Sequence, residues 1–519
     1  MNIKYKFSSI ALLAAALTFS SCEKAVEVDP RQSIDMSTAL NSRENVNAAI
    51  TGAYSRFKSL RSYGRDMVAF PEALADNGRF TNKSGRLANE ARNLHNAHFG
   101  NWQIYYYAIN DINLALEAIP ELNVIPAVTE DEKKAWEGQL QFLRALSYFD
   151  LVRTYAYDPG TGSAVGTNDK GGVPLVLSGV KSLGDAVLRL PSRAKVEDVY
   201  KQIYADLKDA EAKLGNIGSS PATASKQAAQ ALLARAALYN KDYATAKEYA
   251  DKVIASHGSR LLTASGYVNG WRNRVNPESL FEVTFTINAE NNGVNESLQT
   301  SFTTLVVAGN RSQTGGFGDL VPTNSLLADL GITMTALSNG ASSNGNSAAA
   351  IASRNTDVRN QLYELGTAGR GAPFVETTKF LGKNGSINLD NTPVLRVSEM
   401  FLIRAEALST VGSSVFNEAA ARADLIKIKE NRYSDYAGSA RATADLALTG
   451  AALRNEILRQ RRIEFAFEGH RFFDLKRLGM DLVKAPHYST VPFTDYRILP
   501  PLPIRELDGN PNLVNNSGY

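Results

Sequence analysis

The stretch from Arg459 to Gly479, RQRRIEFAFEGHRFFDLKRLG, places charged side chains between large apolar ones. It holds six cations (Arg459, Arg461, Arg462, Arg471, Lys476 and Arg477), three carboxylates (Glu464, Glu468 and Asp474) and four phenylalanines (Phe465, Phe467, Phe472 and Phe473). A solvated charged face would not alternate with phenylalanines. Ions held away from water must be paired, because an unpaired buried charge is strongly destabilising. The stretch therefore predicts helices that cross over an internal ion-pair network.

Two interpretations of this stretch compete. At helical spacing, Arg461–Glu464 and Glu468–Arg471–Asp474–Arg477 lie three residues apart, so opposite charges meet on neighbouring turns. Gly469 permits a bend or a close backbone approach. The same residue types would also suit an acid/base centre made of Glu464, Glu468, His470 and Asp474. We favour the structural network, because arginine stays charged and its fork suits static pairing. Its predicted members are Arg461, Arg462, Glu464, Glu468, Arg471, Asp474 and Arg477.

The N-terminus carries a targeting signal. Lys4 and Lys6 precede an apolar run over 10–19, and small residues then lead to Cys22. This pattern predicts a signal peptide over 1–21, and the run is too short to remain as a membrane span. Cys22 is the only cysteine, so the chain forms no internal disulfide. Its position resembles the acylation site of bacterial lipoproteins, with 22–41 as a tether; the alternative is a soluble exported protein with an incidental cysteine.

Composition and motifs argue against several function classes. A net charge of +3 over 519 residues is too mild to indicate nucleic-acid binding. The sequence lacks a Walker loop, a zinc-protease histidine pair, a hydrolase serine elbow and Cys-x-x-Cys. His95 and His98 have a spacing seen in metal sites, but no third ligand is nearby. We therefore predict no enzyme activity, cofactor or metal. Carboxylates for glycosidic cleavage stay open as an alternative, with candidates Glu72, Asp76, Glu282, Glu296 and Asp319.

Apolar residues recur at helical spacing over most of the chain. The clearest helices are predicted over 42–60, 102–119, 130–155, 196–214, 226–239, 243–256, 394–409 and 417–430. In the pair 226–239 and 243–256, small residues such as Ala234, Ala237, Ala246 and Ala250 fall near the positions that tetratricopeptide repeats keep small. The sequence therefore predicts stacked helix pairs in a curved, mainly α array.

Other segments lack a helical period. Residues 64–100 and 288–325 are predicted to be irregular loops, 280–287 a short strand, and 336–353 a mobile low-complexity stretch. A sugar is bound by flat aromatic rings against its C–H face and by polar groups around its hydroxyl rim. Both kinds of group occur in or beside these segments. The predicted ligand-binding residues are Asp76, Asn77, Arg79, Phe80, Tyr267, Trp271, Arg272, Phe317 and Asp319, with Trp271 favoured most.

Several of these stretches match the motifs of one family. The pattern RRxEFxFEGxRxxDLxR is matched by Arg461, Arg462, Glu464, Phe465, Phe467, Glu468, Gly469, Arg471, Asp474, Leu475 and Arg477. Further matches are GAYSRF at 52–57, FLRALSYFDLVRTY at 142–155, GGVPL at 171–175, VLRVSEMFLIRAEALS at 394–409 and the last residues, 499–519. In these motifs and their order, the chain resembles the SusD/RagB family of surface nutrient-binding lipoproteins.

The resemblance implies a fold and a function. The expected fold is mainly α, a tetratricopeptide-like superhelix with a loop-rich region of minor β structure, in which 42–275 and 276–519 intertwine as one unit. The expected function is to capture an oligosaccharide on the outer membrane, facing the cell exterior, and to deliver it to a SusC-like TonB-dependent transporter. A lipid anchor would be the only membrane attachment. The alternatives are a peptide-binding importer component, a surface glycoside hydrolase and a protein-interaction scaffold.

Overall fold

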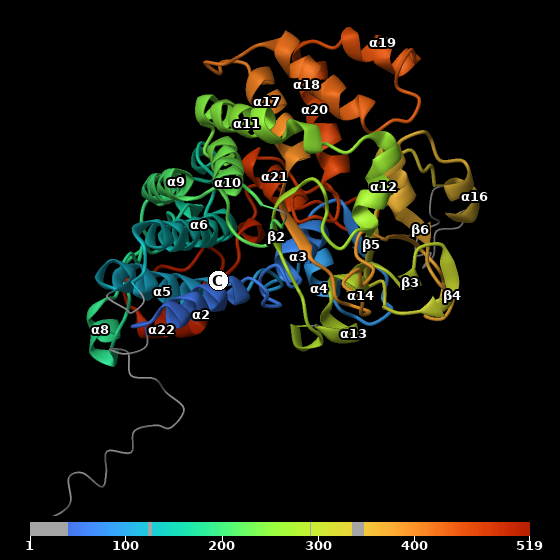
Figure 1. Ribbon diagram of the computed structural model, residues 1–519. Coiled ribbons are helices and arrows are strands. Elements are labelled where there is room, and N and C mark those ends of the chain that lie inside the picture. Colours follow the sequence, from blue (N-terminus) through green and yellow to red (C-terminus); the bar gives the residue numbers. More distant parts are fainter. Residues whose placement is uncertain (1–39, 123–126, 219, 291, 335–346) are drawn as a thin grey trace, which may run out of the picture.

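A computed structural model describes residues 40–122, 127–218, 220–290, 292–334 and 347–519. The predicted signal peptide, Cys22 and nearly all of the tether lie outside the described residues. Helices dominate the described chain, and the strands are few and short, which confirms the predicted fold class. Figure 1 shows the long helices stacked along one side of the molecule and the loop-rich region on the other.

The long helices form a curved array in which each helix packs against the next. The order of contact is α5 to α6, α6 to α9, α9 to α10, α10 to α11, α11 to α17 and α17 to α18 (Figure 1). Alanines are fully buried on α10, so its neighbours approach closely on more than one side. The helices concerned are α2 (Arg43–Arg56), α5 (Trp102–Ala118), α6 (Glu130–Tyr155), α9 (Val196–Lys213), α10 (Lys226–Tyr239), α11 (Tyr243–His257), α17 (Val397–Ser409), α18 (Glu418–Glu430) and α20 (Gly450–Glu464).

The longest helix, α6, begins at a capping box. Thr129 Oγ1 accepts from the Glu132 backbone N–H at 3.2 Å, and the Glu132 carboxylate accepts from the Thr129 backbone N–H at 2.9 Å. Thr129 is exposed, so its replacement leaves no cavity. We expect Thr129→Ala to lower the free energy of unfolding by about 1 kcal/mol, and Thr129→Ser to stay near wild type. Urea unfolding followed by circular dichroism measures both; equal losses for the two variants would contradict a role for the hydroxyl.

The loop-rich region is built on four two-stranded antiparallel ladders. β1 (Gly78–Phe80) pairs with β5 (Leu320–Pro322), and β2 (Ser279–Val283) pairs with β8 (Thr392–Arg396). The other two ladders join β3 (Leu305–Val307) to β4 (Asn310–Thr314) and β6 (Tyr363–Leu365) to β7 (Val375–Thr377). Short helices lie between these strands in the sequence: α12 (Ala264–Arg272), α13 (Gly293–Glu296), α14 (Leu298–Phe302), α15 (Asn324–Asp329) and α16 (Ser347–Ala352). A further short helix, α19 (Ala440–Leu446), lies between α18 and α20.

Several helices lie where the sequence predicted none, among them α3 (Asp66–Leu74) and α12. α3 falls within the segment expected to be loop, and all nine of its residues are buried. The helix spans only nine residues and contains Pro71, so its sequence offers too few turns to show a helical period. α12 was missed because it is short and contains two glycines. The remaining short helices are α4 (Ala88–Ala91), α7 (Gly162–Val165), α8 (Leu183–Leu188), α21 (Arg471–Arg477) and α22 (Ile504–Gly509).

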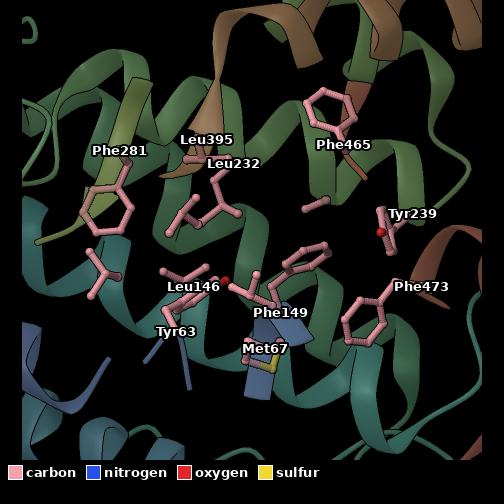
Figure 2. Packing of buried hydrophobic residues seen from close by; sticks show 14 of the residues in the cluster. Tyr63, Met67, Leu146, Phe149, Leu232, Tyr239, Phe281, Leu395, Phe465 and Phe473 are labelled. Carbon is pink, nitrogen blue, oxygen red and sulfur yellow. The ribbon is translucent and has the colours of Figure 1, made fainter. Parts of the chain in front are cut away.

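One hydrophobic core joins the helical array to the loop-rich region. Figure 2 shows residues of α6 and α10 packed against residues of β2, β8 and the stretch after α20. The labelled residues are Tyr63, Met67, Leu146, Phe149, Leu232, Tyr239, Phe281, Leu395, Phe465 and Phe473. Because these come from nearly the whole length of the chain, the array and the loops are positioned by the same packing.

Candidate functional site

The charged stretch after α20 lies inside the molecule. The Glu464 carboxylate is fully buried and accepts hydrogen bonds from Arg432 Nε at 2.9 Å, Arg396 Nη1 at 3.1 Å and Arg359 Nη1 at 3.4 Å. Burial alone would raise the Glu464 pKa, but these three guanidinium groups hold it well below its ordinary value. Glu464 is therefore a permanently ionised junction between segments far apart in the sequence.

The pairing within this stretch differs from the helical spacing that the sequence suggested. Asp474–Arg477, at 2.9 Å, forms as expected at three residues apart. The other expected pairs do not form. Glu468 and Arg471 are separated by the break between α20 and α21, where Phe467 and Gly469 have positive φ. Arg461 and Glu464 within α20, and Arg471 and Asp474 within α21, pair with other segments instead of with each other. The charged groups reach other segments instead: Arg461 to Asp474 and Glu399, Arg462 to Asp76 and Asp329, Glu468 to Arg396 and Lys379, Arg471 to Asp76, and Arg477 to Glu406.

Burial also decides how these groups can act. Glu464, Glu468, His470 and Asp474 are all buried, so a substrate has no access to them. Burial lowers the pKa of His470 well below its usual value, and the nearby arginines lower it further, so the ring is neutral. Burial acts against ionised Asp474, yet Arg461 and Arg477 keep its pKa low. This geometry is that of a static brace between segments.

Three of the predicted ligand-binding residues, Asn77, Tyr267 and Trp271, are buried in this interior, and Asp76 and Arg272 are half-buried at its edge. Asp76 accepts from Arg471 at 2.6 and 2.8 Å, and Asn77 Oδ1 accepts from Arg462 Nε at 2.8 Å. Tyr267, Trp271 and Arg272 lie on α12, where the two aromatic rings are fully buried. We therefore correct the sequence prediction for Asn77, Tyr267 and Trp271, which are fully buried; for Asp76 and Arg272 ligand contact stays a prediction.

The physical reason is visible at α12. The Trp271 ring lies 4.7 Å from Lys379 Nζ and 5.4 Å from the Arg396 guanidinium carbon, so it covers buried cations of the network. Arg272 donates to the Thr378 hydroxyl oxygen at 2.9 Å and pairs with Glu364 at 3.4 Å. The Tyr267 and Trp271 side chains point into the core because α12 packs its apolar face against the core.

The other four predicted residues lie close together: Phe80 and Phe317 are half-buried at one surface, and Arg79 and Asp319 are buried beneath it. The β1–β5 ladder pairs Arg79 with Val321 and Phe80 with Leu320, and the Thr81 backbone N–H donates to the Asp319 carbonyl oxygen at 2.9 Å. Two loops more than 200 residues apart are thereby joined at one edge. Arg79, Phe80, Phe317 and Asp319 thus lie on neighbouring backbone segments of the loop-rich region.

Aromatic rings and cations alternate on this surface. Phe80 is half-buried and stacks on Tyr488, with ring centroids 6.0 Å apart and an interplanar angle of 20°. The Phe80 backbone N–H donates to the Tyr488 hydroxyl oxygen at 3.1 Å, and the Arg92 guanidinium lies 4.4 Å from the Phe80 ring centroid. The Phe80 and Tyr488 rings are therefore fixed in place, with the Arg92 guanidinium beside them.

Phe317 repeats the arrangement. The guanidinium carbons of Arg86 and Arg370 lie 4.5 Å and 3.8 Å from its ring centroid. Arg79 and Lys83 lie 4.8 Å and 5.3 Å from the buried Phe374 ring. We call this surface the cationic aromatic face; it comprises Arg79, Phe80, Lys83, Arg86, Arg92, Phe317, Arg370, Phe374 and Tyr488.

Two carboxylates organise the loops beneath the face. Asp319 accepts from the Ser84 hydroxyl and from Arg86 Nε at 3.2 Å. Glu376 accepts from Lys83 Nζ at 3.3 Å and from the Thr304 backbone N–H at 2.7 Å. Burial raises the pKa of both acids, while their cationic and hydroxyl partners oppose the rise. Asp319 therefore has a supporting place under the face.

Sequence reasoning missed several members of this face. Arg86 and Arg92 lie in and beyond the same loop as Phe80, but nothing in their local sequence separates them from surface arginines. Arg370, Phe374 and Tyr488 come from the β6–β7 connection and from a turn near the C-terminus. Only the tertiary fold places these segments beside β1, so no single-sequence signal identifies them.

The remaining sequence candidates have ordinary structural positions. Glu72 and Glu282 are fully buried; burial raises the Glu72 pKa to about 7, although Asn77 donates to its carboxylate at 2.8 Å. Glu296 pairs with Arg65. His98 is buried against Phe472. Among the described residues, no group of three or more histidine, cysteine, aspartate or glutamate side chains is arranged to hold a metal ion.

A groove lies elsewhere in the molecule. It has a volume of 920 Å³ and runs between α12 and the connection from α18 to α19. It is lined largely by neutral polar side chains, among them Ser265, Asn269, Gln361 and Asn431, and by the edges of Tyr433 and Tyr436. Both tyrosines are buried, so the groove offers no open aromatic ring. The cationic aromatic face is the stronger candidate for ligand contact.

In the part of the chain that the structure describes, no helix has the length and apolar character of a membrane span.

Family models match two parts of the chain. Residues 26–238 match a SusD-like model described as starch-binding and associating with the outer membrane, and residues 372–490 match the SusD family model.

Relatives and solved structures agree with these matches. Two SusD-like proteins of Formosa agariphila, P38 and P2, are 25% and 26% identical; each alignment covers 99% of this chain and 100% of the relative. A SusD superfamily structure from Bacteroides thetaiotaomicron has a TM-score of 0.74 at 23% identity, covering 91% of this chain and 99% of that one. A laminarin-binding SusD-like protein has a TM-score of 0.64 at 20% identity, covering 92% and 100%. By its motifs, its matches to two models of the family and its fold, this chain belongs to the SusD/RagB family.

Proposed function

We propose that this protein is an outer-membrane lipoprotein, anchored through Cys22, that binds an oligosaccharide on the cell exterior. The observation that carries the proposal is the cationic aromatic face, where half-buried rings lie among hydrogen-bond donors. A sugar would place its C–H face on Phe80 or Phe317, and its hydroxyl groups would bind the guanidinium groups beside them. The laminarin binding of one structural neighbour supports a glycan as the ligand class.

The two regions of the fold would have different roles. The helical array offers a broad surface for a SusC-like TonB-dependent transporter, and the loop-rich region holds the ligand. Binding alone suffices for this role, because the transporter moves the cargo. The buried positions of Glu464, Glu468 and Asp474 support a binding protein over a hydrolase. Residues 42–275 and 276–519 would act together, since the β1–β5 ladder joins the two parts.

We expect Phe80→Ala and Phe317→Ala each to weaken glycan binding by about tenfold. Each substitution removes one ring from the face, and a ring contact contributes about 0.5–1.5 kcal/mol beyond the area it buries. The measurement is a glycan array followed by isothermal titration calorimetry on the oligosaccharides that bind. Phe80→Tyr and Phe317→Tyr should retain most of the affinity, because they keep the ring.

The matched control is Phe416→Ala. Phe416 is 45% exposed on the connection between α17 and α18, away from the face. Its loss should leave affinity unchanged. Equal affinity in wild type, Phe80→Ala and Phe317→Ala would remove the face as the site. Shortening of a bound oligosaccharide on long incubation would favour a hydrolase, and saturable binding of peptides alone would favour a peptide importer.

A further inference from the structure

We propose that the cationic aromatic face selects acidic oligosaccharides, whose sugars carry carboxylate or sulfate groups. The inference rests on the proposed function, because it names the ligand class of the same site. Its basis is the local charge of the face, which differs from that of the whole chain.

The face concentrates positive charge. Five cations lie against its rings: Arg79 and Lys83, whose side chains are buried under the surface, and Arg86, Arg92 and Arg370, which reach it. The chain as a whole has a net charge of only +3. Asp319 and Glu376 each pair with one of these cations, Arg86 and Lys83. Among the described residues, Arg92 and Arg370 have no carboxylate within ion-pair distance. Positive charge on one surface attracts an anion and repels a cation.

Unused hydrogen-bond donors point to the same ligand. Arg86 Nη2 and Arg370 Nε are buried and have no hydrogen-bond partner within the described structure. Both groups belong to the guanidiniums that lie against the Phe317 ring. A buried donor without an acceptor is unfavourable, and an anionic oxygen is its strongest acceptor. A small shift of either side chain on binding would let a carboxylate or sulfate accept from both arginines.

The spacing of rings and cations favours a sugar over an acidic peptide. One pattern occurs twice on the face: a flat aromatic ring lies beside a guanidinium group. Phe80 lies beside Arg92, and Phe317 lies beside Arg86 and Arg370. A uronate or sulfated sugar has the matching pattern, an apolar C–H face beside an anionic group on the same ring. An acidic peptide carries its charge on flexible side chains without such a face.

The test compares each acidic oligosaccharide with its neutral counterpart. Wild-type protein is titrated with an oligogalacturonate and with the same oligosaccharide after carboxyl reduction, and with a sulfated carrageenan oligosaccharide before and after desulfation. Neutral laminarin oligosaccharides and an oligoglutamate complete the set. We expect at least one acidic ligand to bind about tenfold more tightly than its neutral counterpart. Its affinity should fall as salt is raised, because screening weakens attraction between exposed charges.

Two variants locate the effect. Arg92→Gln and Arg370→Gln should each reduce affinity for the acidic ligand, with a smaller loss for its neutral counterpart, while Arg370→Lys should restore part of the binding. The control is Arg441→Gln, which removes the same charge where a guanidinium stacks on Tyr433, 4.0 Å from the ring centroid, beside the groove near α19. Arg441→Gln should bind as wild type.

The possible results separate the two proposals. If neutral oligosaccharides bind at least as tightly as acidic ones and salt has no effect, the inference fails while the proposed function stands. If no oligosaccharide binds, or only oligoglutamate does, both fail. If acidic ligands bind but Arg441→Gln weakens them and Arg92→Gln and Arg370→Gln do not, the groove is the site and the inference fails.

Discussion

Glu464→Gln should lower the free energy of unfolding by about 3–5 kcal/mol at neutral pH. Glu464 is the shared acceptor of Arg432, Arg396 and Arg359 and is fully buried. Glutamine keeps the size of the side chain but removes its charge, and it turns an amide donor toward guanidinium donors. Urea unfolding at neutral pH, followed by circular dichroism, measures the loss.

The pH dependence of this loss distinguishes charge from packing. The folded pKa of Glu464 lies below its ordinary value of 4.5, so the stability it contributes is complete above that value. It is lost as the pH falls through the folded pKa, so wild type and Glu464→Gln should converge in stability in acid. A constant difference at all pH values would indicate a packing defect.

An exposed ion pair supplies the control for the same experiment. Asp198 and Lys201 lie 3.0 Å apart on α9 with largely solvated side chains. Asp198→Asn should change the free energy of unfolding by less than about 1 kcal/mol, because water already solvates both ions. Equal effects of Asp198→Asn and Glu464→Gln would contradict the interior brace.

The helical array could be predicted because apolar residues recur at helical spacing and one helix pair keeps small residues at tetratricopeptide positions. The boundaries expected for 226–239 agree with α10, and those for 243–256 agree with α11 within one residue. α10 is itself buried on nearly every side, but its small residues fit the tetratricopeptide pattern; α3 has only nine residues, contains Pro71 and fits no such pattern. The start of the 394–409 helix was also misplaced: residues up to Arg396 form β8, and the helix begins at Val397.

The charged stretch shows what a single sequence omits. Alternation of ions and phenylalanines indicated buried ion pairs, and the side chains are buried and paired. The partners of these charges could not be predicted from the sequence. Glu464 pairs with Arg359, Arg396 and Arg432, which lie between 32 and 105 residues away in the chain. Local spacing predicts which charges are neighbours on one helix, whereas the ion pairs that form depend on which segments pack together in the fold.

The composition of the cationic aromatic face also depends on tertiary packing. Phe80 and Phe317 were identified because flat rings in irregular segments suit a sugar. Trp271 was favoured on the same ground, yet it lies in the core, since the sequence did not reveal α12. The cations that complete the face come from the loops after β1 and β6. Their relevance depends on which loops the ladders bring together.

The tight turn between α20 and α21 depends on Gly469. Its φ is +86°, and a Cβ added there would lie 2.3 Å from the Met67 carbonyl oxygen on α3. We expect Gly469→Ala to lower the free energy of unfolding by about 2–5 kcal/mol, combining left-handed backbone strain with overpacking against rigid backbone. Chemical denaturation, with the melting temperature as a second reading, measures it.

Gly412→Ala is the matched control for this prediction. Gly412 has a nearly equal φ of +84°, but no atom lies within 4 Å of its added Cβ. Gly412→Ala should therefore cost only the backbone strain, about 1–2 kcal/mol. The difference between the two variants isolates the contact between the turn and α3, which sets the brace against the helix that leads into β1. Equal losses would mean that this contact does not fix the turn. The polar contacts of the same stretch with Glu72, Asp76 and Asn77 would then join the interior brace to β1.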